Sequence, residues 1–304
     1  MVNEKKEVAL KEKKDAALLS VFAAIILTGF KLVIGIVTNS LGILSEALHS
    51  GLDLVAAVIT YFSVRVSDKP ADKKHNYGHG KVENFSALME TILLLITCTW
   101  IIYEAINRLI SNETDIKISI WSYIVVITSI IIDVNRSRML YRVAKKHNSQ
   151  ALEADALHFS TDIWSSAVVL FGLICVNFGF FAADAVAALV VAAIVLLVSY
   201  KLGKKAVDVL LDRAPAETII IVKETLATFP EVKNYHRLKI RTAGADTFIK
   251  VNIHLNPNLS LMEVHELCDK IENTVHSLIP RSELYLHAEP FNPKHTEKEE
   301  DEIL

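Results

Sequence analysis

Six apolar segments, each long enough to cross a lipid bilayer as a helix, are the feature that most constrains this chain. They cover residues 15–38, 41–65, 83–110, 118–141, 152–178 and 181–201. A helix of about 20 residues spans the hydrocarbon core, and only structures that pair their backbone N–H and C=O groups internally are tolerated there. Charged residues interrupt several segments, which favours a packed bundle over separate anchors. The sequence therefore predicts an α-helical membrane protein with a six-transmembrane-helix bundle.

The basic residues predict the orientation of this bundle. Lysine and arginine are frequent in the N-terminal tail and in residues 65–81, 136–146 and 201–205, whereas the alternate loops hold only Arg108 and Lys117. Loops rich in basic residues stay on the cytoplasmic side. We therefore expect a multi-pass protein with both termini in the cytoplasm. The expected location is a bacterial plasma membrane.

The composition agrees with a membrane domain that has a soluble appendage. Of the 304 residues, 52% are hydrophobic and 22% are charged. That is too apolar for an ordinary soluble protein and too charged for one that lies wholly in lipid. The net charge of −3 gives no sign of nucleic-acid binding. The three cysteines, Cys98, Cys175 and Cys268, are scattered singly and form neither a disulfide framework nor a CxxC site.

The soluble appendage alternates between helix and strand patterns. Residues 216–228 and 260–278 have the pattern of helices, and residues 233–241, 247–255 and 283–290 have the pattern of strands. This order predicts a cytoplasmic α+β domain of the type α-β-β-α-β. The predicted parts of the chain are an N-terminal tail, a transmembrane domain, a cytoplasmic metal-binding and dimerisation domain, and a charged flexible tail, at residues 1–14, 15–210, 211–292 and 293–304.

For two of these elements the sequence also predicts which residues are buried and which face solvent. In 247–255 alternate residues are apolar, so we expect a half-buried strand whose polar face bears Lys250, Asn252 and His254. The helix at 260–278 has Ser260 as its expected N-cap. Its expected buried stripe is Val264, Leu267, Cys268, Ile271, Val275 and Leu278.

Two stretches inside apolar segments repeat one polar pattern. Residues 45–53 read SEALHSGLD, and residues 153–162 read EADALHFSTD. Each copy contains a histidine and an aspartate four residues beyond it, namely His49, Asp53, His158 and Asp162. Residues four apart share one face of a helix, so two facing stripes bring two imidazoles and two carboxylates together. Such a ligand set suits a tetrahedral divalent ion, and zinc in particular.

A structural explanation competes with the metal site. The His-x3-Asp spacing is common, and His265 with Asp269 repeats it on the soluble helix. Within lipid, however, a central aspartate costs about 2.5–3.5 kcal/mol, so two copies favour a metal or proton site over a hydrogen-bonded pairing of helices. Glu46 and Asp155 lie about one turn away and are candidates to orient the histidines as hydrogen-bond acceptors.

This chain resembles the cation diffusion facilitator family over nearly its whole length. The resemblance rests on the two repeated stretches 45–53 and 153–162, here called the cassettes, on the loop PADKKHNYGHGKVE and on the C-terminal LYLHAEP. The resemblance implies six membrane helices, a cytoplasmic metallochaperone-like domain and a homodimer. It also implies export of zinc or a related divalent ion in exchange for protons. The implied transport site is His49, Asp53, His158 and Asp162, a set similar to the family's zinc-type arrangement and unlike its four-carboxylate manganese type.

The resemblance implies two further groups of zinc ligands. In the loop they are Asp72, His75 and His79, although a solvated turn built on Gly78 and Gly80 explains the same residues. In the soluble domain, where surface histidines are the alternative explanation, the implied ligands are His236, His254, His265, His287 and Glu289. Glu289 occupies a position where the better-studied pattern has aspartate, which places its geometry in question.

The remaining charged residues of the apolar segments are not assigned to a metal site. Glu90 is expected to face the pathway or to pair with a hydroxyl group, and Asp133 to pair with Arg136. Lys31 is expected to extend toward a membrane surface.

These features predict a transporter and not an enzyme. Protonation of a histidine or carboxylate ligand releases a bound ion, which couples proton entry to export. A membrane metalloenzyme is disfavoured because four protein ligands leave no position for water and no HExxH motif occurs. A membrane-anchored metal sensor or scaffold without transport is the alternative of another class. Among transporters, export of Fe(II), Co, Mn or Cd is the alternative to zinc.

Overall fold

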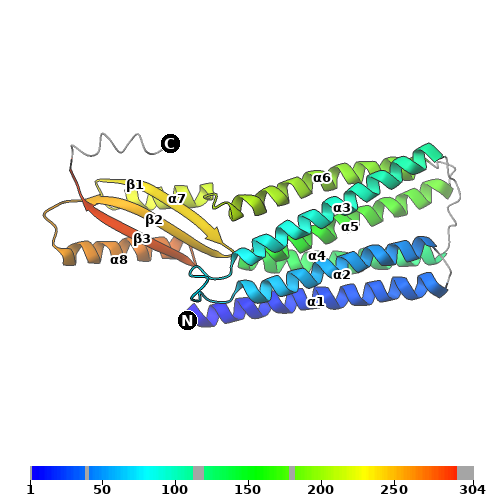
Figure 1. Cartoon of the computed structure of the whole chain (residues 1–304), viewed down its shortest axis with the longest axis horizontal. Helices are drawn as coiled ribbons and strands as arrows, with labels where there is room; N and C mark the ends of the chain where they lie inside the picture. Colours follow the sequence, from blue (N-terminus) through cyan, green and yellow to red (C-terminus); the bar gives the residue numbers. More distant parts are fainter. Residues whose placement is uncertain (1, 38–40, 112–119, 178–181, 293–304) are drawn as a thin grey trace. The chain divides into compact units, whose positions relative to one another are not determined.

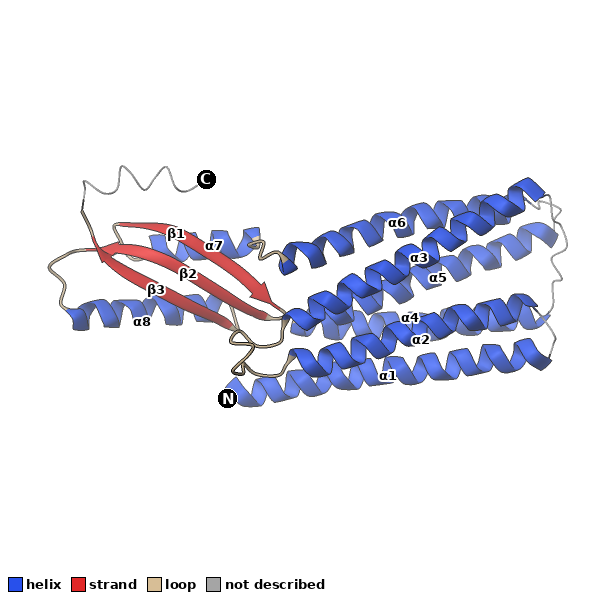
Figure 2. Cartoon of the chain, viewed as in Figure 1, coloured by secondary structure: helices blue, strands red, loops and turns tan. Residues whose placement is uncertain are grey.

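The computed structural model describes residues 2–37, 41–111, 120–177 and 182–292. The chain divides into two compact units, Met1–Val207 and Asp208–Leu304. The first is made of long helices, and the second combines helices with a small sheet (Figures 1 and 2). The predicted charged tail 293–304 lies outside the described residues.

Six long helices form the first unit, as the sequence predicts. They are α1 Val2–Val37, α2 Leu41–Ser67, α3 Lys81–Ser111, α4 Ile120–His147, α5 Gln150–Asn177 and α6 Ala182–Leu210. Several continue beyond their apolar segments, so that α1 includes most of the predicted tail 1–14. Only Asn148 and Ser149 separate α4 from α5. Asn148 has φ of 50°, a left-handed conformation that asparagine tolerates and that ends a helix.

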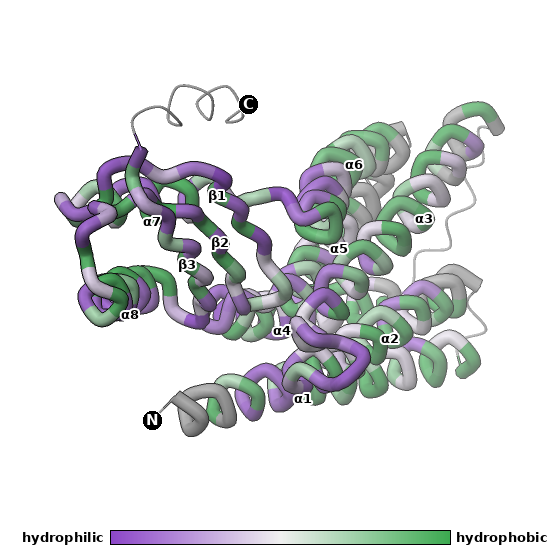
Figure 3. Tube along the Cα trace, turned by 60° about the vertical axis from the view of Figure 1, so that its left-hand side comes forward, coloured by the Kyte–Doolittle hydropathy of each residue, from purple (hydrophilic) through white to green (hydrophobic). Residues whose placement is uncertain are grey.

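The helices pack as a bundle with an apolar exterior. Helix α1 packs along α2, α4 packs along α5, and α2 also contacts α5. Large apolar side chains such as Phe22, Ile26 and Trp100 are exposed on the outside of the helices, and Figure 3 shows how apolar residues predominate along them. Exposed apolar surface of this extent is typical of contact with lipid.

Among the described residues, three helical stretches are long and apolar enough by themselves to cross a membrane. They are Val8–Val37, Ala47–Ser67 and Lys81–Asn107. Helix α4 is less apolar because it includes charged residues such as Asp133 and Arg136. Both of these side chains are buried within the bundle, so these charged residues of α4 face other helices.

A buried ionic cluster near the start of α3 connects α1, α2 and α3 with the turn between α4 and α5. Lys13 on α1 is 1% exposed and lies 3.0 Å from Glu83 on α3 and 2.5 Å from Asp68. The Glu83 carboxylate also accepts hydrogen bonds from Ser67 at 3.0 Å and from Ser149 at 2.6 Å. Because both charges are paired and hydrogen-bonded, their burial is compensated.

The second unit has the predicted order of elements. It consists of α7 Ala216–Ala227, β1 Asn234–Ala243, β2 Asp246–Leu255, α8 Leu261–Leu278 and β3 Ser282–Pro290. The sheet order is β1-β2-β3, with β1 antiparallel and β3 parallel to β2. Gly244, with φ of 61°, lies in the β1–β2 turn, and α8 provides the crossover that parallel strands need.

The core of this unit lies between the sheet and its two helices. Val222 of α7, Val251 and Ile253 of β2, and Ile271 and Val275 of α8 are fully buried in one cluster. Ser260 caps α8 as predicted: its hydroxyl accepts the N–H of Glu263, whose carboxylate accepts the N–H of Ser260.

Two predicted faces are wrong in detail. Leu278 is 54% exposed, and Ile279, one residue beyond α8, is buried in its place because the chain turns there. On β2, Lys250 is exposed as expected, but Asn252 and His254 are 5% and 3% exposed. Polar side chains of the neighbouring strands surround them, so the polar face of β2 is buried at its end.

Candidate metal sites

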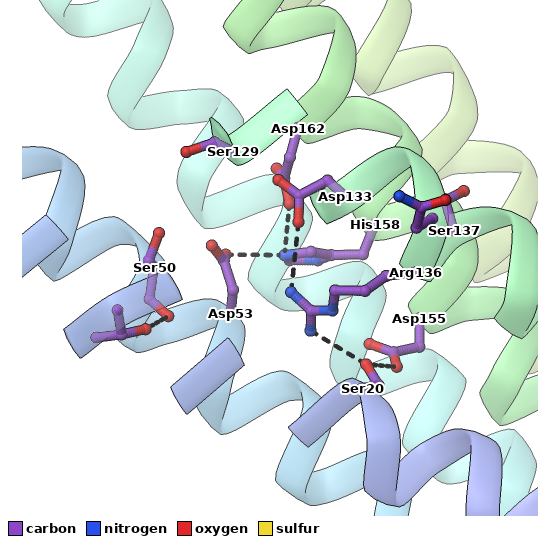
Figure 4. A network of polar contacts seen from close by, with 12 residues as sticks. Ser20, Ser50, Asp53, Ser129, Asp133, Arg136, Ser137, Asp155, His158 and Asp162 are labelled. Atoms are coloured by element: carbon purple, nitrogen blue, oxygen red, sulfur yellow. Dashed lines mark hydrogen bonds and ion pairs between the residues drawn. The ribbon is translucent and has the colours of Figure 1, made fainter. Parts of the chain in front are cut away.

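The His-x3-Asp pairs of α2 and α5 lie close together. Figure 4 shows three of the four residues, Asp53, His158 and Asp162. Nε2 of His158 lies 3.1 Å from Oδ1 of Asp53 and 3.7 Å from Oδ2 of Asp162. Nε2 of His49 lies 4.0 Å from Oδ1 of Asp53 and 3.8 Å from Oδ1 of Asp162. We refer to these four residues as the α2–α5 site. Each carboxylate therefore faces both imidazoles.

These separations fit the ligand cage of a small cation. Zn–N and Zn–O bonds of about 2.0–2.1 Å place tetrahedral ligand atoms about 3.3–3.5 Å apart. The histidine–carboxylate separations, 3.1 to 4.0 Å, bracket that value. Ligand atoms of His49, Asp53 and Asp162 also lie within 4.8 Å of one another. His158 does not join that group, so a four-ligand cage requires side-chain movement that brings the two imidazoles onto one ion.

The α2–α5 site is closed on one side and accessible on the other. The side chains of His158 and Asp53 are 2% and 9% exposed, whereas those of Asp162 and His49 are 15% and 34% exposed. A pocket lined by His49, Asp53 and Asp162 also touches Lys31, Asp133, Ser165 and Ser166. His49 and Asp162 are therefore the more accessible members of the site.

A second polar network lies beside this site. Arg136 donates to Asp133 at 3.4 Å, which confirms that predicted pair, and to Ser20 at 3.1 Å. Ser20 in turn donates to Asp155 at 3.2 Å. The guanidinium carbon lies 3.5 Å from the ring centroid of Phe159. Arg136 thus supplies a buried positive charge among the acids of α4 and α5 (Figure 4).

Two expectations about neighbouring residues are corrected. Asp155 does not orient a cassette histidine among the described contacts; it accepts the Ser20 hydroxyl. Lys31 does not extend outward, because it is 4% exposed and donates to the hydroxyl of Ser50 at 2.8 Å. A burial pattern of this kind depends on α1 packing along α2, which the sequence of α1 alone does not specify. The side chain of Glu46 lies outside the described residues.

The loop residues Asp72, His75 and His79, here the loop site, form a compact cluster. Nδ1 of His75 lies 3.2 Å and Nε2 of His79 lies 3.5 Å from the Asp72 carboxylate. The loop turns at Gly78, whose φ of 74° is a left-handed conformation that favours glycine. Oδ1 of Asp72 accepts the backbone N–H groups of Lys74 and His75, and these bonds lower the pKa of that carboxyl group. It is therefore ionised at neutral pH.

The strand register assembles the third group. His236, His254 and Glu289, here the sheet site, have ligand atoms within 4.8 Å of one another. His254 pairs with Glu289 across β2 and β3, and their side-chain atoms are 3.3 Å apart. His287 adds a contact of 3.4 Å to Glu289. Within this chain His265 lies elsewhere, on α8, 3.7 Å from Asp269 and 68% exposed.

The side chain of Glu289 reaches the histidines despite its extra methylene group. Oε2 lies 3.3 Å from His254 and 3.8 Å from His236, while Oε1 accepts a hydrogen bond of 2.8 Å from Asn252. Asn252 therefore holds the carboxylate in place.

Comparison with known proteins decides the family. Residues 17–211 match the family model described as the cation efflux transmembrane domain, and residues 214–291 match the cytoplasmic domain of cation efflux proteins. This chain belongs to the cation diffusion facilitator family. It is a membrane protein for cation efflux, and its family is one of transporters.

Relatives of this facilitator cover nearly its whole length. It is 32% identical to the cation-efflux pump FieF of Yersinia enterocolitica over 280 residues, which are 91% of this chain and 92% of the relative. It is 30% identical to an uncharacterized transporter of Methanocaldococcus jannaschii over 282 residues, 92% of this chain and 99% of the relative. The metal-bound C-terminal domain of the CzcD transporter from Thermotoga maritima is 31% identical, with a TM-score of 0.24. That match covers 24% of this chain and 87% of the other.

One residue that the sequence analysis left out of the metal site lies beside the facilitator's α2–α5 site. Glu90 of α3 is fully buried, accepts the Thr60 hydroxyl at 2.7 Å, and has Oε2 only 3.8 Å from Nδ1 of His158. The hydroxyl pairing agrees with expectation, but the contact with His158 does not follow from any local pattern. A glutamate isolated in an apolar helix was the available signal.

Proposed function

We propose that this facilitator exports Zn²⁺ from the cytoplasm in exchange for protons through the α2–α5 site. The observation that carries the proposal is the convergence of His49, Asp53, His158 and Asp162 from two helices at separations suited to four-coordinate zinc. Imidazole favours zinc over the harder manganese ion, for which carboxylates and water are preferred. The cation-efflux role of the family gives the direction of transport.

Competition between ion and proton for the same atoms supports exchange. Nε2 of His158 and Oδ1 of Asp53 lie 3.1 Å apart, a distance at which one proton bridges them. A metal ion needs both lone pairs, so it must displace that proton. Proton binding from outside then weakens the cage and releases the ion. Alternating access follows if α2 and α5 move relative to each other.

We further propose that the loop site and the sheet site bind zinc on the cytoplasmic side. Each contains at least two histidines and one shared carboxylate, a donor set suited to zinc. The distribution of basic residues supports cytoplasmic termini, and the family resemblance implies a homodimer. Light scattering of the protein in nanodiscs tests the dimer.

Ion flux into proteoliposomes under an imposed pH gradient tests the transport proposal. We expect gradient-dependent zinc flux in the wild type and its loss in both Asp53→Ala and His158→Ala. Parallel assays with Fe(II), Co, Mn and Cd report the selectivity. Flux of another ion but not zinc overturns the ion assignment, and zinc flux that is indifferent to the gradient overturns proton exchange. Metal binding without flux of any ion favours the alternative function, a membrane-anchored metal sensor without transport.

A further inference from the structure

Glu90 is a fully buried acid beside the α2–α5 site that the transport proposal does not use. Its Oε1 accepts the hydroxyl of Thr60 at 2.7 Å, which fixes one side of the carboxylate. Its Oε2 and Nδ1 of His158 are both buried and have no hydrogen-bond partner among the described residues. These two atoms lie 3.8 Å apart. Among the described ion pairs, Glu90 is the carboxylate that contacts Nδ1 of His158.

The two ring nitrogens of His158 have different neighbours. Nε2 faces Asp53 at 3.1 Å and Asp162 at 3.7 Å, whereas Nδ1 faces Glu90 on α3. A neutral imidazole has one protonated nitrogen and one with a free lone pair. An ion bound to Nε2 takes that lone pair, so the ring proton must reside on Nδ1. A buried Nδ1–H then needs an acceptor, because an unsatisfied buried donor is costly.

The present separation is longer than a hydrogen bond. In the ion-free arrangement Nε2 can donate to Asp53, and Nδ1 then needs no acceptor. When Nε2 binds an ion, a relative movement of about 1 Å brings Nδ1 and Oε2 into hydrogen-bonding distance. The other acid near this helix turn, Asp155, accepts the Ser20 hydroxyl through Oδ2, and none of its described contacts is with Nδ1 of His158.

We propose that Glu90 is a positioning residue that accepts the Nδ1–H of His158 in the ion-loaded site and so presents Nε2 to the ion. This inference rests on the proposed function of the α2–α5 site. It connects α3 to the ion cage, which otherwise involves α2 and α5. Carboxylate acceptors behind metal-bound histidines fix the tautomer and ring orientation, and Glu90 provides this role from a neighbouring helix.

Zinc affinity of Glu90 variants tests the proposal. The background is the full-length chain with Asp72→Ala and Glu289→Ala, which removes the shared carboxylate of the loop and sheet sites. We expect Glu90→Leu to weaken zinc binding about 10- to 100-fold. Glu90→Gln should restore affinity to within a few-fold of the background chain, because its amide oxygen accepts the same N–H. Equal affinity in the Leu variant and its parent overturns the proposal.

A matched control separates positioning from general damage. Glu83 is a second fully buried glutamate of α3, but its carboxylate bonds to Lys13, Ser67 and Ser149 and to no histidine among the described contacts. In the same background Glu83→Gln should lower the thermal midpoint and leave zinc affinity unchanged. A loss of affinity equal to that of Glu90→Leu contradicts a specific role for Glu90.

Nitrogen NMR of histidine-labelled protein gives an independent readout if Glu90→Leu does not fold. In the zinc-loaded background chain and in Glu90→Gln, His158 should be protonated at Nδ1 and metal-bound at Nε2. Metal on Nδ1 overturns the inference. Failure of the transport proposal gives another result. In that case His158→Ala leaves zinc affinity unchanged, both with glutamate and with leucine at position 90.

Discussion

His49 is the most exposed of the four proposed zinc ligands, with 34% of its side chain accessible, and His158 is the most buried at 2%. The histidine at the accessible side is therefore the one whose replacement disturbs packing least. It is also one of only two nitrogen donors in the set. Ion preference should accordingly respond to substitution at His49 while the fold is retained.

We predict that His49→Asp shifts the preference of the site from zinc toward manganese. A set with one imidazole and three carboxylates suits a harder ion. The expected fall in zinc affinity relative to manganese is about tenfold or more, equivalent to about 1.4 kcal/mol. Competition binding measures it. The control is His265→Asp, which alters an exposed histidine of the same His-x3-Asp spacing; an equal shift in both variants contradicts the assignment.

The loop site permits a prediction about pH. Hydrogen bonds from the backbone N–H groups of His75 and Lys74 lower the pKa of Asp72. A lowered folded-state pKa stabilises the turn above the unfolded pKa, and this contribution is lost as pH falls through the folded value. The amides of Lys74 and His75 should thus stay protected from hydrogen exchange at neutral and mildly acidic pH. Loss of protection already near neutrality is the contradicting result.

Local patterns predict some of these residues and not others. The His-x3-Asp cassettes were recognisable because a helix places residues four apart on one face. The contact between Glu90 and His158 was not, because it depends on how α3 packs against α5. The burial of His254 was missed for a related reason: period-two alternation assigns a face to a strand but does not say that neighbouring strands cover the polar one.

At the scale of helices, close approach between α3 and α6 depends on a small residue. A methyl group built on Gly203 of α6 lies 2.9 Å from Cγ2 of Thr91 on α3. Thr91 has limited freedom because its hydroxyl donates to the carbonyl oxygen of Ala87 at 2.8 Å. Small residues at such crossings let membrane helices pack tightly.

We predict that Gly203→Ala destabilises the bundle by about 1–3 kcal/mol, the usual cost of overpacking. Adding Thr91→Ser should restore most of the loss, because serine keeps the hydroxyl and lacks the methyl group. Thermal unfolding in detergent measures both variants. Gly29→Ala is the control, since no atom lies within 4 Å of the added group. No rescue by the double variant would contradict this packing account.

Element order was the most predictable level of this fold. All six long helices and the α-β-β-α-β order follow from hydrophobic periodicity and length. The ends were less predictable. Helices α1, α4 and α6 continue past their apolar segments because polar residues can remain helical outside lipid, so hydropathy marks the membrane-spanning part and not the helix end.

At the scale of the whole molecule, the proposal joins a transmembrane ion site to two cytoplasmic sites. Each unit has its own buried core, so occupancy of the sheet site can change without unfolding the bundle. We propose that loading of the cytoplasmic sites biases the transport motion.

We predict that Glu289→Ala raises the cytoplasmic zinc concentration needed for half-maximal flux and leaves the maximal rate nearly unchanged. The variant removes the carboxylate shared by His236 and His254 but none of the α2–α5 ligands. Flux at a series of zinc concentrations measures it. Glu283→Ala, on an exposed position of the same strand, is the control. A lower maximal rate with unchanged zinc dependence would argue against a regulatory sheet site.

The most direct test of the central claim is X-ray absorption at the zinc edge of the full-length chain with Asp72→Ala and Glu289→Ala. The α2–α5 site predicts four nitrogen and oxygen ligands at about 2.0–2.1 Å, with outer-shell scattering from two imidazoles. In His49→Ala and in His158→Ala, the outer-shell scattering should correspond to one imidazole instead of two. A six-coordinate oxygen shell without imidazole scattering would contradict a zinc site shared by the two cassettes.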